Sequence, residues 1–191
     1  MITMVIFFIS DQSLMERNNK ENILVIGGTG MLLDACKYFA QSNNVYVVSR
    51  HELDTAYENI FHIKADYTKP DEFLKIIADT FKNKNFPGKM IIWVHSSGDD
   101  ALDLLLNYVI SNYPDTKFFH IKGSGNFNPS NAGKIILQNI NYFEIILGFI
   151  LSNDASRWLT NEEISTGVVE AVGKEEKSFT IGVTEPWEMH P

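Results

Sequence analysis

The chain has 191 residues, a length typical of one domain, and 45% of them are hydrophobic, which is enough for a full core. The formal net charge is −8, from 16 basic and 24 acidic residues, which disfavours a nucleic-acid binder with its usual basic face. No segment is long and apolar enough to span a membrane, and a single cysteine excludes an intramolecular disulfide, so we expect a cytoplasmic protein without membrane partners.

An N-terminal extension is expected over residues 1–21. Residues 1–10 are apolar, and the residues after them are polar and charged. The apolar run is short, has no basic residue before it and lacks a small-residue cleavage site, so it is unlike a signal peptide. A flexible tail, an added strand and an artefact of an upstream start codon are the alternatives, of which we favour the tail or the artefact. A single domain is then expected over 22–191.

A glycine turn follows the first predicted strand. Residues 23–27 are hydrophobic, as in a strand covered on both faces, and lead into the run Gly27-Gly28-Thr29-Gly30-Met31. Apolar residues at helical spacing then predict a helix over 30–42. Glycines let a backbone approach phosphates closely, and the free N–H groups of a new helix attract their charge. The pattern therefore predicts that the run binds the pyrophosphate of a dinucleotide.

The second predicted strand, 45–50, ends on Ser49 and Arg50, without an acidic residue. In a unit that prefers NAD, an Asp or Glu at this place hydrogen-bonds the ribose 2′-hydroxyl. An arginine suits a 2′-phosphate, through its charge and its planar fork of donors. We therefore expect NADP to be preferred over NAD. A solvated arginine at a strand end is the alternative interpretation.

Strands and helices alternate along the rest of the chain. Thr160 and Glu163 form a capping-box pattern at the start of the last helix. The alternation predicts a three-layer, doubly wound parallel sheet of about seven strands, the Rossmann fold. The remaining predicted strands are 60–65, 90–95, 117–121, 142–149 and 178–183, and the remaining helices are 70–83, 100–112 and one from residue 160.

Three polar residues near strand ends are candidates for chemistry. His95 and His120 end neighbouring predicted strands, so both are expected at the carboxyl edge of the sheet, as proton donors or as structural histidines. Ser124 follows the fifth strand and is either a hydrogen-bond donor to a substrate carbonyl or a loop residue. Asp99 and Asp100 are the only nearby third ligands for a metal, and no metal site is predicted.

Two other residue types are interpreted as structural. Cys36 falls among apolar residues of the first predicted helix, which favours a buried thiol without chemistry. Trp158 and Trp187 flank the last helix and strand, and we expect both to be packing anchors rather than ligand contacts.

Over residues 22–184, the chain resembles the short-chain dehydrogenase/reductase family in an atypical, truncated form. The resemblance implies that Asp66 contacts the adenine ring, that the Tyr67 backbone lies near it, and that the turn 96–98 backs the cofactor ribose. The run 157–160 is also similar to a group of short bacterial proteins assigned to this family. The residues that carry the main resemblance are Gly27, Gly28, Thr29, Gly30, Ser49, Arg50, Asp66, Tyr67, Ser96, Ser97 and Gly98.

The chain departs from that family in its catalytic half. Leu33 stands where a third glycine would allow close packing of helix on strand. The family's Tyr-x-x-x-Lys pair, an acid/base tyrosine and the lysine that lowers its pKa, is expected to be missing from the whole chain: Tyr142 is followed four positions on by Ile146, and Tyr108 by Asn112. The short connection between the fifth and sixth strands leaves little room for the helix that bears the pair.

Two functions remain open on this evidence, and a third is disfavoured. The first is an NADP-dependent oxidoreductase of atypical mechanism and unknown substrate. The second is a non-catalytic NADP(H)-binding sensor or interaction module. A methyltransferase also carries a glycine turn after its first strand, but the Ser49-Arg50 strand end lacks the acid expected there. A homo-oligomer is compatible with either of the first two.

Overall fold

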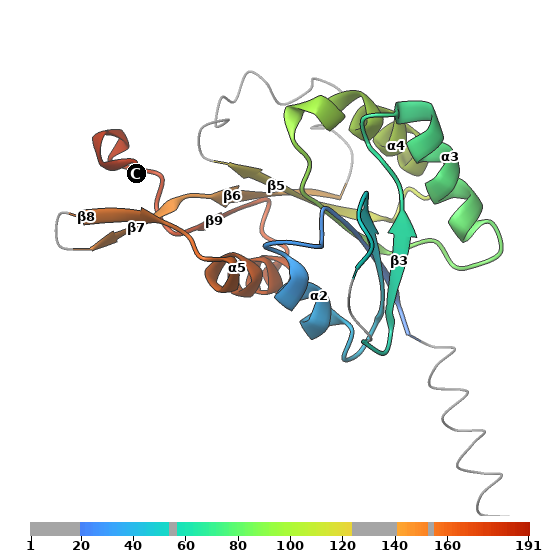
Figure 1. Ribbon diagram of the computed structural model, residues 1–191, viewed down its shortest axis with the longest axis horizontal. Helices are drawn as coiled ribbons and strands as arrows, with labels where there is room; N and C mark the ends of the chain where they lie inside the picture. The colour runs from blue at the N-terminus through green and yellow to red at the C-terminus, as the bar shows by residue number, and fades with distance from the viewer. Residues whose placement is uncertain (1–19, 54–56, 124–140, 153–154) are drawn as a thin grey trace, which may run out of the picture.

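A seven-stranded parallel sheet with helices on both faces forms the molecule (Figure 1). The computed structural model describes residues 20–53, 57–123, 141–152 and 155–191. The predicted doubly wound fold is confirmed, and nearly all of the expected N-terminal extension lies outside the described residues. In spatial order the strands are β3 (Ile60–Lys64), β2 (Asn44–Ser49), β1 (Asn22–Ile26), β4 (Lys89–Ile92), β5 (Lys117–Gly123), β6 (Tyr142–Leu147) and β9 (Ser178–Ile181).

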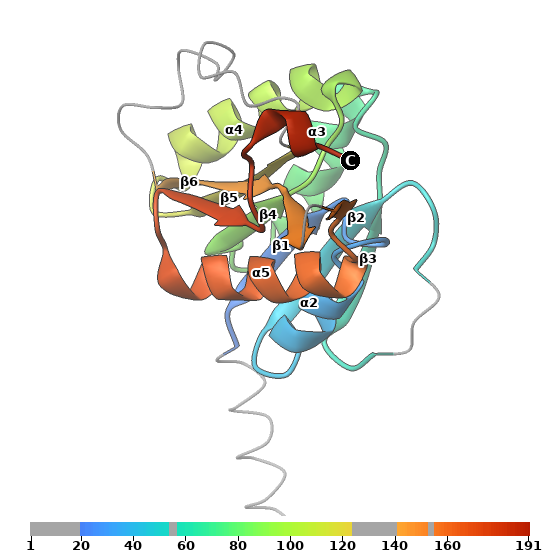
Figure 2. The same ribbon diagram turned by 90° about the vertical axis from the view of Figure 1, so that its left-hand side faces the viewer.

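Among the described residues, helices cover both faces of the sheet (Figure 2). Helices α2 (Leu33–Phe39) and α5 (Asn161–Lys174) pack together on one face, and α3 (Pro70–Phe81) and α4 (Asp99–Asn112) pack together on the other. All five residues of β1 are buried. Ile23 belongs to the core under α2 and α5, and its neighbour Leu24 belongs to the core under α3 and α4, so the strand alternates between two cores.

Helix α3 shows how the sequence builds these layers. Pro70 stands in its first turn, where no backbone N–H is required. Phe73, Ile77 and Phe81 recur at helical spacing and are all buried against the sheet. Burying one such side chain contributes about 1.5–3 kcal/mol to stability. The opposite side of the helix, which includes Lys75, faces solvent.

The first helix is shorter than predicted, because both of its ends are taken up by turns. It begins at Leu33 instead of 30, since the Leu33 N–H bonds to the Gly30 carbonyl at 3.1 Å in a tighter turn. At the other end, both the backbone and the side-chain N–H groups of Asn43 donate to the Phe39 carbonyl at 3.0 Å. The helix therefore has seven residues, and its dipole is correspondingly small.

A hairpin replaces the end of the predicted sixth strand. The strand stops at Leu147, and β7 (Phe149–Ser152) pairs with β8 (Ala155–Trp158) in antiparallel fashion. Gly148 allows this departure, because a Cβ there would lie 2.1 Å from the Val183 carbonyl oxygen. Phe149 and Val183 exchange two backbone hydrogen bonds of 2.9 Å. For the same reason β9 ends at Ile181, two residues earlier than expected.

The capping box at the start of α5 is confirmed and carries an additional ion pair. The Thr160 hydroxyl accepts a bond from the Glu163 N–H, and the Glu163 carboxylate accepts one from the Thr160 N–H. Arg157, at the base of the hairpin, donates two bonds of 2.8 Å to the same carboxylate. The bonds from Arg157, and to a lesser extent the bond from the Thr160 N–H, lower the pKa of Glu163 to about 2.

This network predicts a pH-dependent effect of Glu163→Gln. Because the pKa of Glu163 is depressed in the folded state, its stabilising contribution is present above the ordinary value of about 4.5 and is lost as the pH falls towards 2. The gap in melting temperature between wild type and Glu163→Gln should be constant near neutral pH and shrink below pH 4.5. Glu162→Gln, on the same turn, is the control and should show no such gap. A gap that is unchanged at low pH would contradict the assignment.

No helix within the described ranges is both long and apolar enough to cross a membrane.

Candidate functional site

The glycine turn after β1 is fixed between the two neighbouring strands. Gly27 has a φ of 83°, and its N–H donates to the Val48 carbonyl of β2 at 3.1 Å. On its other side, a Cβ at Gly27 would lie 2.3 Å from the carbonyl oxygen of Trp93, directly after β4. Only glycine satisfies both the dihedral angle and the lack of space. The turn is therefore set by backbone contacts at the carboxyl edge of the sheet.

Leu33 stands where a glycine would allow close packing of the helix on the sheet. In this structure Gly28 provides that close packing instead. This residue is buried, and a Cβ on it would lie 3.0–3.1 Å from the side chains of Val25, Val47 and Cys36. Cys36 is fully buried, and burial raises its pKa to about 12. The interpretation of Cys36 as a structural thiol is confirmed.

The outer half of the turn is open. Thr29 and Gly30 are exposed, and a Cβ on Gly30 would meet no atom within 4 Å. A ligand can therefore approach the backbone at this point without displacing a side chain. The first turn of α2 carries no side-chain cap. The free space lies beside the exposed backbone of the turn, as a bound pyrophosphate requires.

A residue that the sequence did not indicate holds the turn from the opposite side. Ser165 of α5 is 3% exposed, and its hydroxyl donates to the Met31 carbonyl at 2.7 Å. The signal was a hydroxyl on the apolar side of α5, between Ile164 and Val168. Such a buried hydroxyl needs a partner, but 134 residues separate it from Met31 in the chain. Sequence alone could not identify that partner.

Ser165→Ala should loosen the glycine turn without unfolding the protein. The substitution leaves the Met31 carbonyl without its donor and should cost about 1 kcal/mol of folding stability. We expect dinucleotide affinity to fall severalfold as well, because the turn loses its support. Thr166→Ala, an exposed hydroxyl on the same helix, is the matched control. Titration with the reduced dinucleotide and thermal melting of both variants would test this, and identical affinities in the two variants would contradict it.

The ends of β2, β3 and β4 converge around Tyr67. The Arg50 guanidinium carbon lies 5.9 Å from the centre of the Tyr67 ring. Gly98 packs beneath the same ring, where a Cβ would come within 2.7 Å of it. Three separately predicted residues are thus neighbours at the carboxyl edge.

Ser49 and Asp66 have local partners within this region. The Ser49 hydroxyl donates to the His51 carbonyl at 2.6 Å and lies 2.9 Å from Nε2 of His62. Asp66 accepts two bonds from Thr68, which are the main cause of its lowered pKa. Ser49 therefore shapes the turn that presents Arg50, and Asp66 shapes the turn that presents Tyr67.

The turn after β4 presents His95, Ser96 and Ser97 to solvent. Ser96 and Ser97 belong to the short helix η1 (Ser96–Gly98), which leads into α4. The His95 ring stands edge-on to Trp93 at 5.8 Å, and Trp93 contacts the glycine turn. His95 is therefore an exposed imidazole at the same edge.

His120 does not share this place, and its predicted position was wrong. The fifth strand continues to Gly123, so His120 lies inside β5, paired in register with Ile92 of β4. Its Nδ1 lies 2.7 Å from the hydroxyl of Tyr142, and burial lowers the pKa of His120 to about 4. It is a half-buried partner of a tyrosine and is neutral at neutral pH. Ser124 lies outside the described residues.

The expectation that a Tyr-x-x-x-Lys spacing is missing was wrong as a statement about the whole sequence. Tyr113 and Lys117 have this spacing. Tyr113 ends α4 and stacks on Phe86 at 3.9 Å, and Lys117 starts β5 and pairs with Glu175. The pair therefore lies at the amino edge of the sheet, away from the glycine turn, and is not the family's catalytic arrangement.

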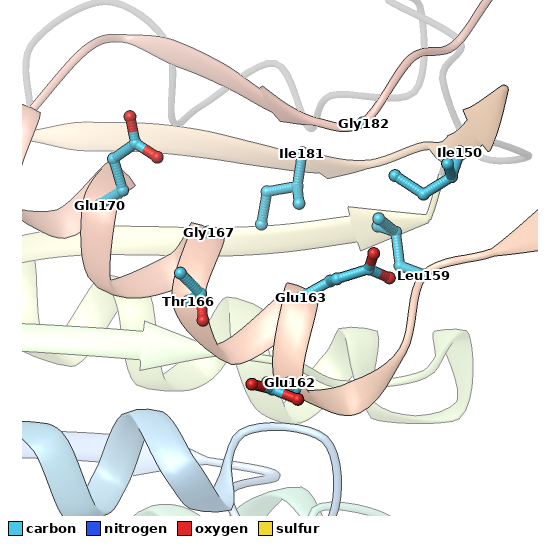
Figure 3. Close-up of a pocket in the computed structure, with 9 residues that line it drawn as sticks. All are labelled: Ile150, Leu159, Glu162, Glu163, Thr166, Gly167, Glu170, Ile181 and Gly182. Atoms are coloured by element: carbon cyan, nitrogen blue, oxygen red, sulfur yellow. The ribbon is translucent and has the colours of Figure 1, made fainter. Parts of the chain in front are cut away.

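A shallow groove of about 330 Å³ lies on the other flank of α5 (Figure 3). Its walls come from α5, the hairpin and the end of β9. The glycine turn does not line it, so it is separate from the region around Tyr67. Within the described ranges, no three His, Cys, Asp or Glu residues are grouped to hold a metal ion.

Solved structures share this fold, although no protein-family model and no curated protein matches the sequence. A short-chain dehydrogenase from Leptospira borgpetersenii with bound NAD+ is 11% identical, with 85% of this chain and 91% of that chain covered and a TM-score of 0.61. The ligand-free aldohexose dehydrogenase of Thermoplasma acidophilum is 12% identical, with 87% of this chain and 94% of that chain covered and a TM-score of 0.59. A protein assigned as an epimerase from Bacteroides thetaiotaomicron is 14% identical, with 88% of this chain and 99% of that chain covered and a TM-score of 0.62. The resemblance to short-chain dehydrogenases is thus confirmed in the fold.

Proposed function

We propose that the chain binds NADP(H) along the carboxyl edge of its sheet and acts as an atypical, truncated short-chain dehydrogenase on a carbonyl substrate. The observation that carries this proposal is the convergence of Arg50, Tyr67 and Gly98 next to the open glycine turn. Dinucleotides bind where parallel strands end in folds of this kind. The pyrophosphate would lie against Gly28, Thr29 and Gly30.

The side chain of Arg50 supports a preference for NADP over NAD as the bound cofactor. Its side chain is exposed, and no carboxylate of the described residues forms an ion pair with it. Its guanidinium lies over the face of Tyr67, which leaves its fork of donors available for a 2′-phosphate. Asp66 is weakly attracted to it and is already engaged by Thr68.

His95 is the best candidate for the proton donor. When bound, a reduced nicotinamide supplies a hydride to the carbonyl carbon, and the carbonyl oxygen then takes a proton. His95 is exposed at the edge where the strands end, and an imidazole can act as a general acid. The half-buried His120 is a poorer candidate, because its Nδ1 is bonded to the Tyr142 hydroxyl and its lowered pKa leaves it neutral.

A measurement of turnover distinguishes an oxidoreductase from a non-catalytic NADP(H)-binding sensor. Purified protein is incubated with NADPH and a panel of aldehydes, ketones and quinones, and the absorbance of the reduced nicotinamide is followed. We expect oxidation by at least one compound, and about 10²-fold slower turnover with unchanged NADPH affinity in His95→Gln. Tight NADPH binding without turnover on any compound, together with a cofactor-dependent protein partner, would favour the sensor. Binding of S-adenosylmethionine without NADPH would favour a methyltransferase.

Two further properties belong to the proposal. We place the protein in the cytoplasm, in keeping with its single buried cysteine. A homo-oligomer is compatible with the free edge of β9, which pairs only with β6 in the described sheet.

A further inference from the structure

The hairpin β7–β8 has two faces with different partners. Its pairing sets Ile150 opposite Arg157, and on this side Ile150 lines the groove along α5 while Arg157 bonds to Glu163. The pairing also sets Phe149 opposite Trp158. Both of these rings contact a residue of the C-terminal segment, so this second face is aromatic.

An aromatic cluster of Phe149, Trp158, Trp187 and His190 forms on that face. The His190 ring is edge-on to Phe149 at 5.2 Å and to Trp158 at 4.7 Å, and it stacks on Trp187 at 4.6 Å. Phe149 is fully buried, whereas Trp158 is 52% exposed and Trp187 is 59% exposed. The expectation that both tryptophans are packing anchors was therefore wrong. Phe149 anchors the cluster, and the two indoles lie open.

The cluster stands at the same edge of the sheet as the glycine turn. Gly148 alone separates β7 from the carboxyl end of β6, and the C-terminal segment continues from the carboxyl end of β9. Because β1, β6 and β9 all run in the same direction, their carboxyl ends meet at one edge (Figure 1). Ser165 ties α5, which follows β8, to the turn itself.

The charges around the cluster restrict what it can bind. Glu185 and Glu188 flank Trp187 in the sequence, and Arg157, which precedes Trp158, is bonded to Glu163. Phosphate and carboxylate groups would be repelled rather than held here. One face of Trp187 is covered by His190, and the exposed parts of both indoles are suited to stacking on another aromatic ring. An exposed apolar patch with a polar rim is typical of a binding surface.

We propose that Trp158 and Trp187 bind a planar, uncharged aromatic ring, and that the substrate is a ring-bearing carbonyl compound, such as an aryl ketone or a quinone. Ring binding at the cluster stands on the geometry above. The statement that the bound compound is also reduced rests on the proposed function. The carboxyl-edge location favours a substrate over a peptide or a lipid surface, because a ring bound there lies on the side of the sheet proposed to hold the cofactor.

The three tryptophans of the chain give a direct readout, one indole N–H resonance each. The ¹⁵N-labelled full chain is titrated with 1-tetralone, an aromatic ketone, and separately with 1-decalone, its saturated counterpart. We expect 1-tetralone to shift the signals of Trp158 and Trp187 saturably and 1-decalone to bind about three- to tenfold more weakly, because it cannot stack. No saturable shift at these two signals, or equal affinity for the two ketones, would overturn the proposal.

Variants supply an independent test. Trp187→Leu should weaken 1-tetralone binding about three- to tenfold. Tyr38→Leu, which removes an exposed ring on α2, is the control and should bind as wild type does. Unchanged affinity in Trp187→Leu would overturn the proposal even if wild type binds. NADPH affinity is measured on the same samples by nicotinamide fluorescence, so a protein that binds the ketone but not NADPH refutes the proposed function alone.

Discussion

Alanine at Gly27 is expected to destabilise the protein by about 3 kcal/mol or more. A left-handed backbone costs a residue with a Cβ about 1–2 kcal/mol, and the φ of Gly27 is 83°. The added methyl carbon would also lie 2.3 Å from the Trp93 carbonyl oxygen, so β1 and β4 would have to separate. These strands are central in the sheet, and stabilities of single domains are only about 5–15 kcal/mol. Chemical denaturation of the purified variant would measure the loss.

Gly30→Ala is the matched control, because it separates folding from binding. A Cβ on Gly30 meets no atom within 4 Å, so stability should change by less than about 0.5 kcal/mol. The methyl group would instead occupy the space proposed for the pyrophosphate, and NADPH affinity should fall. If Gly27→Ala were as stable as wild type, the close contact between the turn and Trp93 would be refuted. Full NADPH affinity in Gly30→Ala would move the pyrophosphate away from the turn.

Arg50→Ala is expected to abolish the preference for NADPH over NADH. A hydrogen bond to a charged group is worth about 1.5–3 kcal/mol, so the affinity for NADPH should fall roughly tenfold to a hundredfold. The affinity for NADH should change little, because NADH has no 2′-phosphate. The ratio of the two dissociation constants, measured by nicotinamide fluorescence, is the relevant quantity. Arg50→Lys should retain part of the preference, since it keeps the charge without the planar fork.

Lys75→Ala controls for the loss of one positive charge. Lys75 lies on the exposed side of α3 and should not affect either affinity. A wild-type protein that binds both dinucleotides equally, or an Arg50→Ala variant that keeps the preference, would reject Arg50 as the selecting residue.

The sequence predicted the elements whose local signals agree with their packing. The hydrophobic run before Gly27 became the fully buried β1, and Thr160 and Glu163 formed the capping box. Arg50 was identified from its position at a strand end, whereas Tyr67 and Gly98 were identified from the resemblance to short-chain dehydrogenases. Parallel strands bring such positions to one edge, which is why the three residues lie together.

The remaining features depend on contacts that are distant in the sequence. The hairpin after β6 depends on Gly148 meeting Val183, and the support of the turn depends on Ser165 reaching Met31. His120 was misplaced because its strand continues to Gly123, two residues further than predicted. No local pattern could reveal these pairings, since each joins segments that meet only in the folded sheet.

The most direct test of dinucleotide binding at the glycine turn is titration of the purified wild-type protein with NADPH and with NADH. Binding is followed by nicotinamide fluorescence, with Gly30→Ala in parallel to report on the site. We expect saturable binding of one dinucleotide per chain, tighter for NADPH than for NADH and weakened in Gly30→Ala. Absence of binding of either dinucleotide would contradict this expectation and would mean that the glycine turn serves the fold alone.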